Sequence, residues 1–352
     1  MKYVAALGTW VFVASAVVAC GGSSDDGGNN NTTGGVAGSG ATSGAGGAGA
    51  GGIAGGGGIA GAGAGGSAGS GAGPTGPKAS ECFKDIYDGN IKVDYDQFQP
   101  SIGSHCQGTN HQDIQGVEKL VFLGDSITDG SPPTPQSGYY RTLLGADLSA
   151  KFPGLEVQSC AKGGADIGDI PGQIAQCFPG GGDNKKTLIV FTIGGNDIVP
   201  MAKSKVSGPE GIKQSEALLA KLAPQVKALK DPTKFPNGSY VVFSNIYEYT
   251  DATTEMNSCP TAVFAGLNGT WPAGLEVFKA LREGYMKIAV DTQTDMIFMG
   301  EEFCGHGYKA GDTNGQCYRG PGSANWFDAT CIHPNPTGHG EIAKIFATVI
   351  AE

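Results

Sequence analysis

Short, almost continuously apolar segments recur along the chain. Four of them span residues 119–123, 187–193, 240–244 and 296–299, and a further strand is expected to lead into residues 158–160. Apolar runs of this length, without alternating polar positions, are typical of parallel strands that are buried on both faces. The pattern therefore predicts a parallel sheet.

Between these runs, apolar residues recur three and four positions apart, as they do on one face of a helix. Such faces occur within residues 218–229, 275–285 and 342–349. Strands that alternate with helices indicate βαβ units with right-handed crossovers. We therefore expect an α/β fold with a mostly parallel sheet covered by helices on both faces. Ligands on such a sheet bind beyond the carboxyl ends of the strands.

The first 19 residues have a different character. Lys2 is followed by an apolar run that is slightly too short for a stable membrane span, which predicts a signal peptide over residues 1–19. Residues 17–20, Val-Val-Ala-Cys, resemble the bacterial lipobox. This resemblance implies a lipid-modified Cys20 and an exported protein anchored in the bacterial cell envelope, in the outer membrane or at the cell surface. An ordinary signal peptide with another cleavage site is the alternative.

Residues 20–78 consist almost entirely of glycine, alanine and serine. Such a segment cannot bury enough apolar surface to offset its backbone entropy, so it is expected to be a disordered tether. A Gly-rich coil of about 55 residues would reach about 40 Å. Residues 79–352 then form one domain, which we expect to be a monomer.

The domain contains eight cysteines, an even number that predicts four disulfides in an exported chain. About 105 connectivities are possible, and bonds between sequence neighbours are the simplest expectation. They would join Cys82 to Cys106, Cys160 to Cys177, Cys259 to Cys304 and Cys317 to Cys331. The sequence has no C-x-x-C motif and no ligand-like spacing of cysteine and histidine, so we expect no metal site. The formal net charge of −10 argues against nucleic acid as a partner.

Candidate chemistry lies where the predicted strands end. Ser126 follows the first strand through Gly124 and Asp125, and Asn196 follows another strand through a Gly-Gly pair. A serine hydroxyl, uncharged amide donors and the late His333 would suit attack on an ester carbonyl. Taken singly, each of these features is also ordinary turn or helix-cap chemistry.

As a set, these residues resemble the SGNH hydrolases, the superfamily of GDSL-type esterases and lipases. The matching blocks are Gly124-Asp125-Ser126, Gly164, Gly194-x-Asn196-Asp197 and His333-Pro334. The resemblance implies a flavodoxin-like three-layer α/β/α sandwich that acts without a cofactor. It also implies that Ser126 is the nucleophile and His333 the general base. The oxyanion hole would consist of the Ser126 amide, the Gly164 amide and the Asn196 side chain.

The acid partner of His333 departs from the family pattern. The family's last block is usually Asp-x-x-His, but Thr330 stands where that aspartate is expected. Either Asp328 folds back to hold the His333 ring, which we favour, or a backbone carbonyl orients the ring. A second histidine, His339, is expected to face solvent or cap the last helix.

The sequence leaves the substrate open. A serine esterase or lipase that cleaves carboxylic esters is the main hypothesis, with the substrate a small-molecule, lipid or sugar ester. A carbohydrate O-acetyl esterase and a lipid-anchored surface binding protein with an inactive fold are the alternatives.

Overall fold

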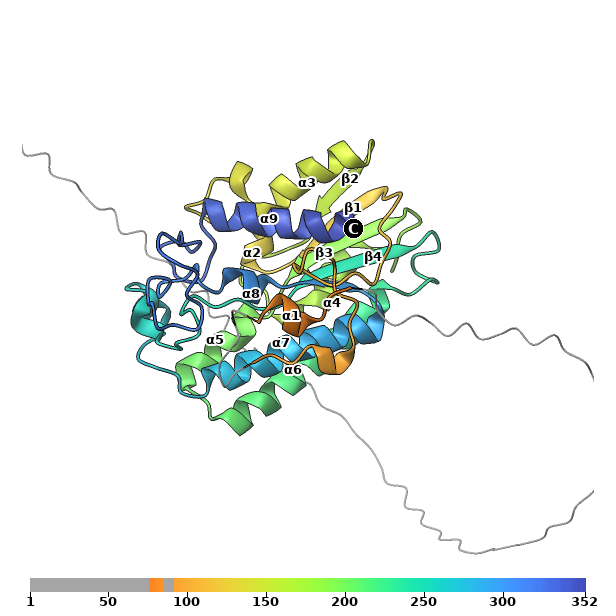
Figure 1. Cartoon of the computed structure of the whole chain (residues 1–352). Coiled ribbons are helices and arrows are strands. Elements are labelled where there is room, and N and C mark those ends of the chain that lie inside the picture. The colour runs from red at the N-terminus through yellow and green to blue at the C-terminus, as the bar shows by residue number, and fades with distance from the viewer. Residues whose placement is uncertain (1–75, 85, 87–91) are drawn as a thin grey trace, which may run out of the picture. The chain divides into compact units, whose positions relative to one another are not determined.

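The computed structural model describes residues 76–84, 86 and 92–352 (Figure 1). The predicted signal peptide, the lipidated Cys20 and all but the last three residues of the predicted tether lie outside the described residues. The predicted domain of residues 79–352 is described almost completely.

A parallel sheet of five strands forms the centre of the domain, in the order β2-β1-β3-β4-β5. The strands are β1 (Lys119–Gly124), β2 (Glu156–Ser159), β3 (Thr187–Thr192), β4 (Ser239–Ser244) and β5 (Asp295–Ile297). The predicted strands are confirmed, with differences at two ends: Ile193 lies beyond β3, and Phe298 and Met299 lie beyond β5. Met299, which the prediction included in that strand, instead begins a short helix.

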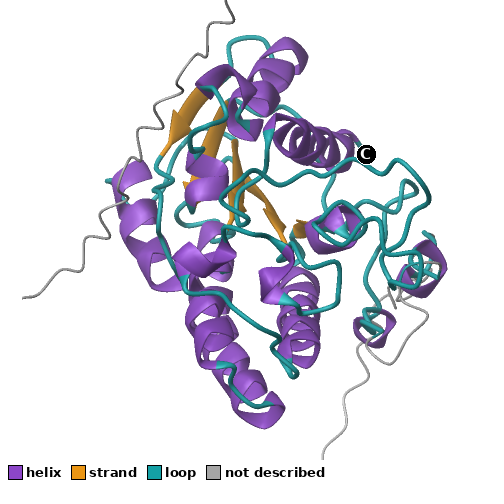
Figure 2. Cartoon of the chain, turned by 90° about the vertical axis from the view of Figure 1, so that its left-hand side faces the viewer, coloured by secondary structure: helices purple, strands orange, loops and turns teal. Residues whose placement is uncertain are grey.

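Helices cover both faces of the sheet, so the predicted three-layer α/β/α arrangement is confirmed (Figures 1 and 2). One layer holds α3 (Tyr140–Lys151) and α9 (Pro336–Ala351), and the other holds α4 (Ile170–Cys177), α6 (Gly208–Leu229) and α7 (Gly274–Thr292). The remaining helices are α1 (Ala79–Cys82), α2 (Ser126–Asp129), α5 (Gly195–Ser204) and α8 (Met299–Phe303).

The core consists of the sheet and the helix faces that pack on it. All six residues of β1 and of β3 are buried. Phe191 of β3 and Phe243 of β4 stack with ring centroids 5.4 Å apart. On α6, the predicted apolar face places Leu222, Val226 and Leu229 at no more than 1% exposure. Burying each of these side chains contributes about 1.5–3 kcal/mol.

All eight domain cysteines form disulfides, as predicted, but only half of the expected pairs are correct. Cys82–Cys106 and Cys160–Cys177 are confirmed. The other two pairs were wrong, because the chain instead forms Cys304–Cys317 and Cys259–Cys331. Cys304 and Cys317 close a loop after α8, which leaves Cys259 to bond with a cysteine that is 72 residues away.

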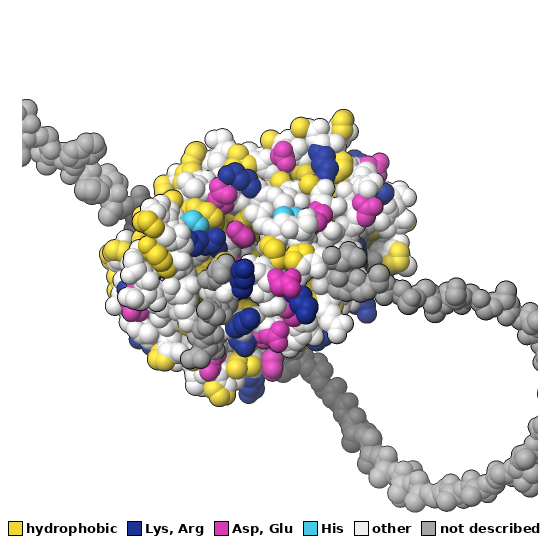
Figure 3. Space-filling view, in the orientation of Figure 1, with side chains coloured by type: hydrophobic (Ala, Val, Ile, Leu, Met, Phe, Trp, Pro, Cys, Tyr) yellow, Lys and Arg dark blue, Asp and Glu magenta, His cyan; other side chains and the backbone are white. Residues whose placement is uncertain are grey.

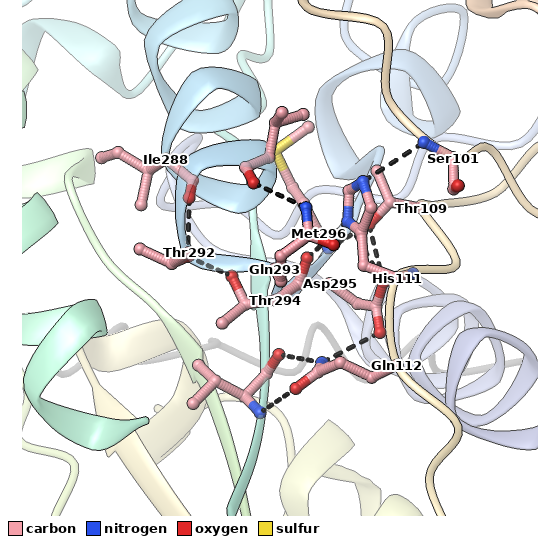
Figure 4. Close-up of polar contacts among 12 residues, drawn as sticks. Ser101, Thr109, His111, Gln112, Ile288, Thr292, Gln293, Thr294, Asp295 and Met296 are labelled. Carbon is pink, nitrogen blue, oxygen red and sulfur yellow. Dashed lines mark hydrogen bonds and ion pairs between the residues drawn. The ribbon is translucent and has the colours of Figure 1, made fainter. Parts of the chain in front are cut away.

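Residues 107–112, which precede β1, cover the edge of the sheet that β5 forms. Thr109 donates its amide to the Met296 carbonyl, and Phe298 donates its amide to Gln107. A buried polar cluster fixes this contact: the Asp295 carboxylate accepts hydrogen bonds from Thr109 Oγ1 (3.0 Å), the His111 amide (2.7 Å) and Gln112 Nε2 (2.9 Å) (Figure 4). Covering an edge strand in this way protects it from pairing with other chains.

The surface carries charges of both signs. Figure 3 shows Lys, Arg, Asp and Glu side chains interspersed over one face of the domain. Among the helices that the structure describes, none is both long enough and apolar enough to cross a membrane.

Replacing Asp295 with alanine should lower the free energy of unfolding by about 3 kcal/mol, because three donors, two of them on the buried side chains of Thr109 and Gln112, would lose their acceptor. Urea unfolding followed by circular dichroism would measure this loss. The matched control is Asp291→Ala on α7, where the carboxylate is exposed and pairs with Lys287 at 2.5 Å. Because both partners of this ion pair are 58% exposed, that change should cost no more than about 0.5 kcal/mol. Equal effects of the two substitutions would contradict a stabilising role for the Asp295 cluster.

Candidate active site

The site lies where the strand order reverses. β1 has β2 on one side and β3 on the other, and the carboxyl ends of β1 and β3 therefore flank the crevice in which ligands of this architecture bind. Ser126 follows β1 as the first residue of α2. Asn196 follows β3 as the second residue of α5.

Gly124 and Asp125 shape the turn that presents Ser126. Gly124 has φ +118°, and a Cβ at this position would lie 2.1 Å from the Thr192 carbonyl oxygen, so only glycine fits. The Asp125 carboxylate accepts hydrogen bonds from the Ile127 amide (3.0 Å) and from Thr192 Oγ1 (2.8 Å). Burial raises the pKa of Asp125 to about 7, against the effect of these hydrogen bonds. Asp125 thus caps α2 and ties the turn to β3.

His333 meets Ser126 from a loop 207 residues further along the chain. Its Nε2 lies 2.9 Å from Ser126 Oγ. Two hydrogen bonds hold the loop at His333 and at the residue before it. The Asp328 amide donates to the His333 carbonyl, and the Tyr247 hydroxyl donates to the Ile332 carbonyl. The structure therefore brings the predicted nucleophile and the predicted base into hydrogen-bond contact.

The predicted direct contact between Asp328 and His333 is wrong. Among the described residues, the hydrogen-bond partner of His333 Nδ1 is Thr330 Oγ1, at 3.0 Å. Thr330 Oγ1 in turn donates to Asp328 Oδ1, at 2.5 Å. Four residues separate Asp328 from His333, and the turn between them places Thr330 in the gap. The alternative expectation, a backbone carbonyl at the ring nitrogen, is not observed either.

Burial lowers the pKa of His333 below its ordinary value of 6.5, and the nearby Asp328 carboxylate opposes that shift. The imidazole is therefore neutral at neutral pH, which is the form that can accept a proton.

The predicted oxyanion donors lie near one another in the fold, although not all of them line the same cavity. Asn196 lines the cavity at Ser126 and donates one Nδ2 hydrogen to the Ala165 carbonyl, at 2.8 Å. This bond leaves its second amide hydrogen for a ligand. Gly164, with φ +81°, directly precedes Ala165 but is exposed and lies outside the cavity lining. The neighbouring Gly163 amide is taken by Asp129 Oδ2.

The cavity beside Ser126 and His333 encloses about 920 Å³, including its opening to solvent. Its wall is mostly apolar and is assembled from α5, from α7 and from the long segment after β4. The apolar wall residues include Ile198, Val199, Ala202, Ile246, Met256, Leu267, Trp271, Phe278 and Met299. Tyr247 and Tyr249, from the segment after β4, also line the cavity. The sequence analysis missed the apolar wall, because its residues follow the pattern of an ordinary hydrophobic core.

Comparison with protein families agrees with this geometry. The model of the GDSL-like Lipase/Acylhydrolase family matches residues 122–340. The chain belongs to this family. It is therefore a carboxylic ester hydrolase, and the matched region contains Ser126, Asn196 and His333.

Several solved structures are similar to this GDSL-like hydrolase. An extracellular lipase from Streptomyces rimosus shares 18% identity over 66% of this chain and 100% of its own, with a TM-score of 0.43. Phospholipase A1 from Streptomyces albidoflavus NA297 shares 18% identity over 66% of this chain and 99% of its own, with a TM-score of 0.44. A putative GDSL-like lipase from Parabacteroides merdae ATCC 43184 shares 16% identity over 68% and 99%, with a TM-score of 0.47. Comparison with curated proteins gives no match.

His339 of this GDSL-like hydrolase does not face solvent, contrary to the sequence expectation. It is fully buried beneath the site, where its Nδ1 accepts the Tyr140 amide at 3.3 Å. Burial, together with the smaller effect of a charge on His333, lowers the pKa of His339 to about 4. His339 therefore packs as a neutral side chain between α3 and α9.

No cluster of three or more His, Cys, Asp or Glu side chains suited to a metal ion occurs among the described residues.

The pH dependence of kcat/KM should report the lowered pKa of His333. Because the neutral imidazole is the active form, kcat/KM should be constant near neutral pH and fall as the pH drops through a pKa below 6.5. A pH–rate profile on a soluble nitrophenyl ester would measure this, with Ser126→Ala as the background control. An acidic limb centred above pH 6.5 would show that His333 is not the desolvated base described here.

Proposed function

We propose that this GDSL-like hydrolase cleaves carboxylic esters with an apolar acyl chain, through an acyl-enzyme intermediate on Ser126. The observation that carries the proposal is the apolar cavity that opens at the Ser126–His333 pair. An acyl chain placed in this cavity would bring its ester carbonyl to the serine oxygen.

The proposed reaction has two steps. His333 Nε2 takes the proton of Ser126 as the serine oxygen attacks the ester carbonyl, and the resulting imidazolium then protonates the leaving alcohol. Water, deprotonated by the same nitrogen, releases the acid from the acyl-enzyme. The 2.9 Å contact between Ser126 and His333 supports this assignment, because proton transfer needs that geometry.

The proposed oxyanion hole uses the Ser126 amide, the Gly164 amide and the Asn196 side chain. The free amide hydrogen of Asn196 and the left-handed backbone at Gly164 support it. Such donors stabilise the tetrahedral intermediate because charge develops on the carbonyl oxygen only during attack.

The polar groups along the cavity favour an apolar chain over a sugar. The Tyr247 hydroxyl donates to Ile332, the Tyr249 hydroxyl donates to Met256, and Trp271 Nε1 donates to Val206. The Glu248 carboxylate accepts hydrogen bonds from residues 250 and 252. Because these polar groups already have hydrogen-bond partners within the protein, few of them would remain to bind sugar hydroxyls. This is why we favour acyl esters over the carbohydrate O-acetyl esterase alternative.

Narrowing the cavity should shorten the preferred acyl chain. Ala202 of α5 lines the cavity, and Ala202→Phe would fill part of it. We expect kcat/KM for nitrophenyl octanoate to fall by about 10-fold to 100-fold, while the value for the acetate changes less than about threefold. The matched control is Ala150→Phe at an exposed position of α3, which should leave the profile unchanged. An unaltered chain-length profile in Ala202→Phe would mean that the acyl chain binds elsewhere.

We further propose that the enzyme is exported and held in the bacterial envelope by a lipid on Cys20, with the glycine-rich segment as a tether. The lipobox-like Val-Val-Ala-Cys sequence supports this proposal, as do the four disulfides of the domain, which are typical of exported proteins.

Replacing Cys20 with serine should remove the anchor without affecting catalysis. In bacteria fed radiolabelled palmitate, the wild-type chain should be labelled and sediment with membranes. The Cys20→Ser chain should be unlabelled and should lose membrane attachment, with unchanged kcat/KM on a soluble ester. Label that persists in Cys20→Ser would refute modification at this cysteine.

A further inference from the structure

We infer that Thr330 is a positioning residue, which couples Asp328 to the catalytic histidine and selects the tautomer of His333. This inference rests on the proposed roles of Ser126 and His333. The hydrogen-bonded series then has four members, in the order Ser126, His333, Thr330 and Asp328. Thr330 is the added member, and it stands where the family pattern has an aspartate.

The geometry assigns a direction to each hydrogen bond in the series. Asp328 Oδ1 accepts both the Thr330 amide at 2.8 Å and the Thr330 hydroxyl at 2.5 Å. An ionised carboxylate can only accept, so the single hydroxyl hydrogen of Thr330 points to Asp328. Thr330 Oγ1 then presents only lone pairs to His333 Nδ1.

This arrangement decides which ring nitrogen carries the proton. Because Thr330 Oγ1 cannot donate towards the ring, Nδ1 must be the protonated nitrogen of the neutral imidazole. Nε2 is then the acceptor that faces Ser126 Oγ, as proton abstraction requires. In the opposite tautomer, Nδ1 and Thr330 Oγ1 would face each other as two acceptors, at 3.0 Å.

The arrangement also stabilises the charge that forms during attack. When Nε2 takes the serine proton, His333 becomes a cation, and the polarised Thr330 hydroxyl points its negative end at Nδ1–H. No proton needs to move along the series, because Thr330 and Asp328 keep their own protonation states throughout. Asp328 is 6% exposed, and its backbone carbonyl accepts a hydrogen bond from the Tyr308 hydroxyl.

The surroundings of the series make a substitution at Thr330 informative. Thr330 is exposed at the surface of its loop, whereas Asp328 and Cys331 are buried. Two titratable groups interact with His333 through their charges: Asp328 from its own loop and His339 from α9. A change at Thr330 can therefore remove the hydroxyl without opening the core or removing a charge.

The test compares Thr330→Val, which keeps the shape of the side chain but removes the hydroxyl, with Thr330→Ser, which keeps the hydroxyl. In the full chain with its disulfides formed, we expect Thr330→Val to lower kcat about 100-fold with little change in KM. Thr330→Ser should stay within about threefold of the wild type. Both variants should melt within a few degrees of the wild type. A kcat for Thr330→Val within about threefold of the wild type would overturn the inference.

A double-mutant cycle tests whether Asp328 acts through Thr330. Asp328→Ala should lower kcat about 100-fold in the wild type but only several-fold in the Thr330→Val background, because the coupling is already lost there. An equal loss in both backgrounds would show that the carboxylate acts on His333 without Thr330.

The pH profile and the ring tautomer separate this role from a merely structural one. Asp328→Ala should move the acidic limb of kcat/KM to lower pH, since the carboxylate raises the pKa of His333. Thr330→Val keeps that charge and should move the limb less.

In ¹⁵N-histidine spectra of Ser126→Ala, assigned with His333→Gln, the His333 ring should be protonated at Nδ1. Adding Thr330→Val should give a mixture of tautomers, and an unchanged single tautomer would contradict the inference. If wild-type and Ser126→Ala proteins were equally inactive on esters, the proposed function itself would fail.

Discussion

The burial of the parallel sheet on both faces is the constraint on which the rest of the molecule depends. Because β1 and β3 have no solvent-facing side, their polar chemistry can appear only where the strands end. The turn after β1 and the turn after β3 therefore carry Ser126 and Asn196, and α9 begins just after the loop that carries His333. The same burial makes the scaffold rigid enough to hold a hydrogen bond between residues that are 207 positions apart.

Desolvation ties this scaffold to the chemistry. The apolar cavity that would take an acyl chain also removes water from one side of His333, which keeps the imidazole neutral. The Asp328 carboxylate works against that shift from the other side of the ring. These two opposing effects set the pKa of His333, which in the proposed reaction must be neutral before the attack and charged during it. At His339 no carboxylate among the described residues opposes the shift, and burial with the charge of His333 lowers its pKa to about 4.

The strands, the amphipathic helices and the motif residues could be predicted from local patterns, because each depends on spacing within a few residues of the chain. Ser126 and His333 could be singled out as a pair because the motifs that carry them are short and contiguous, and the fold brings them into contact. The role of Thr330 could not be predicted in this way, since it depends on how the four residues between Asp328 and His333 turn. The pairing of Cys259 with Cys331 and the apolar cavity wall depend on contacts across the fold, and Leu267 or Trp271 looks like any core residue in the sequence.

The Cys259–Cys331 bridge joins the segment that walls the cavity to the loop that carries His333. Thr261 reinforces the junction by donating its hydroxyl to the Ala329 carbonyl. The cavity wall and the proposed base are therefore cross-linked, although the two segments lie about 70 positions apart in the sequence. Such a cross-link constrains divergence, because a change that moves the cavity wall at Cys259 also pulls on the loop that carries His333. In a loop-grafting experiment the two segments would have to be transplanted as one module.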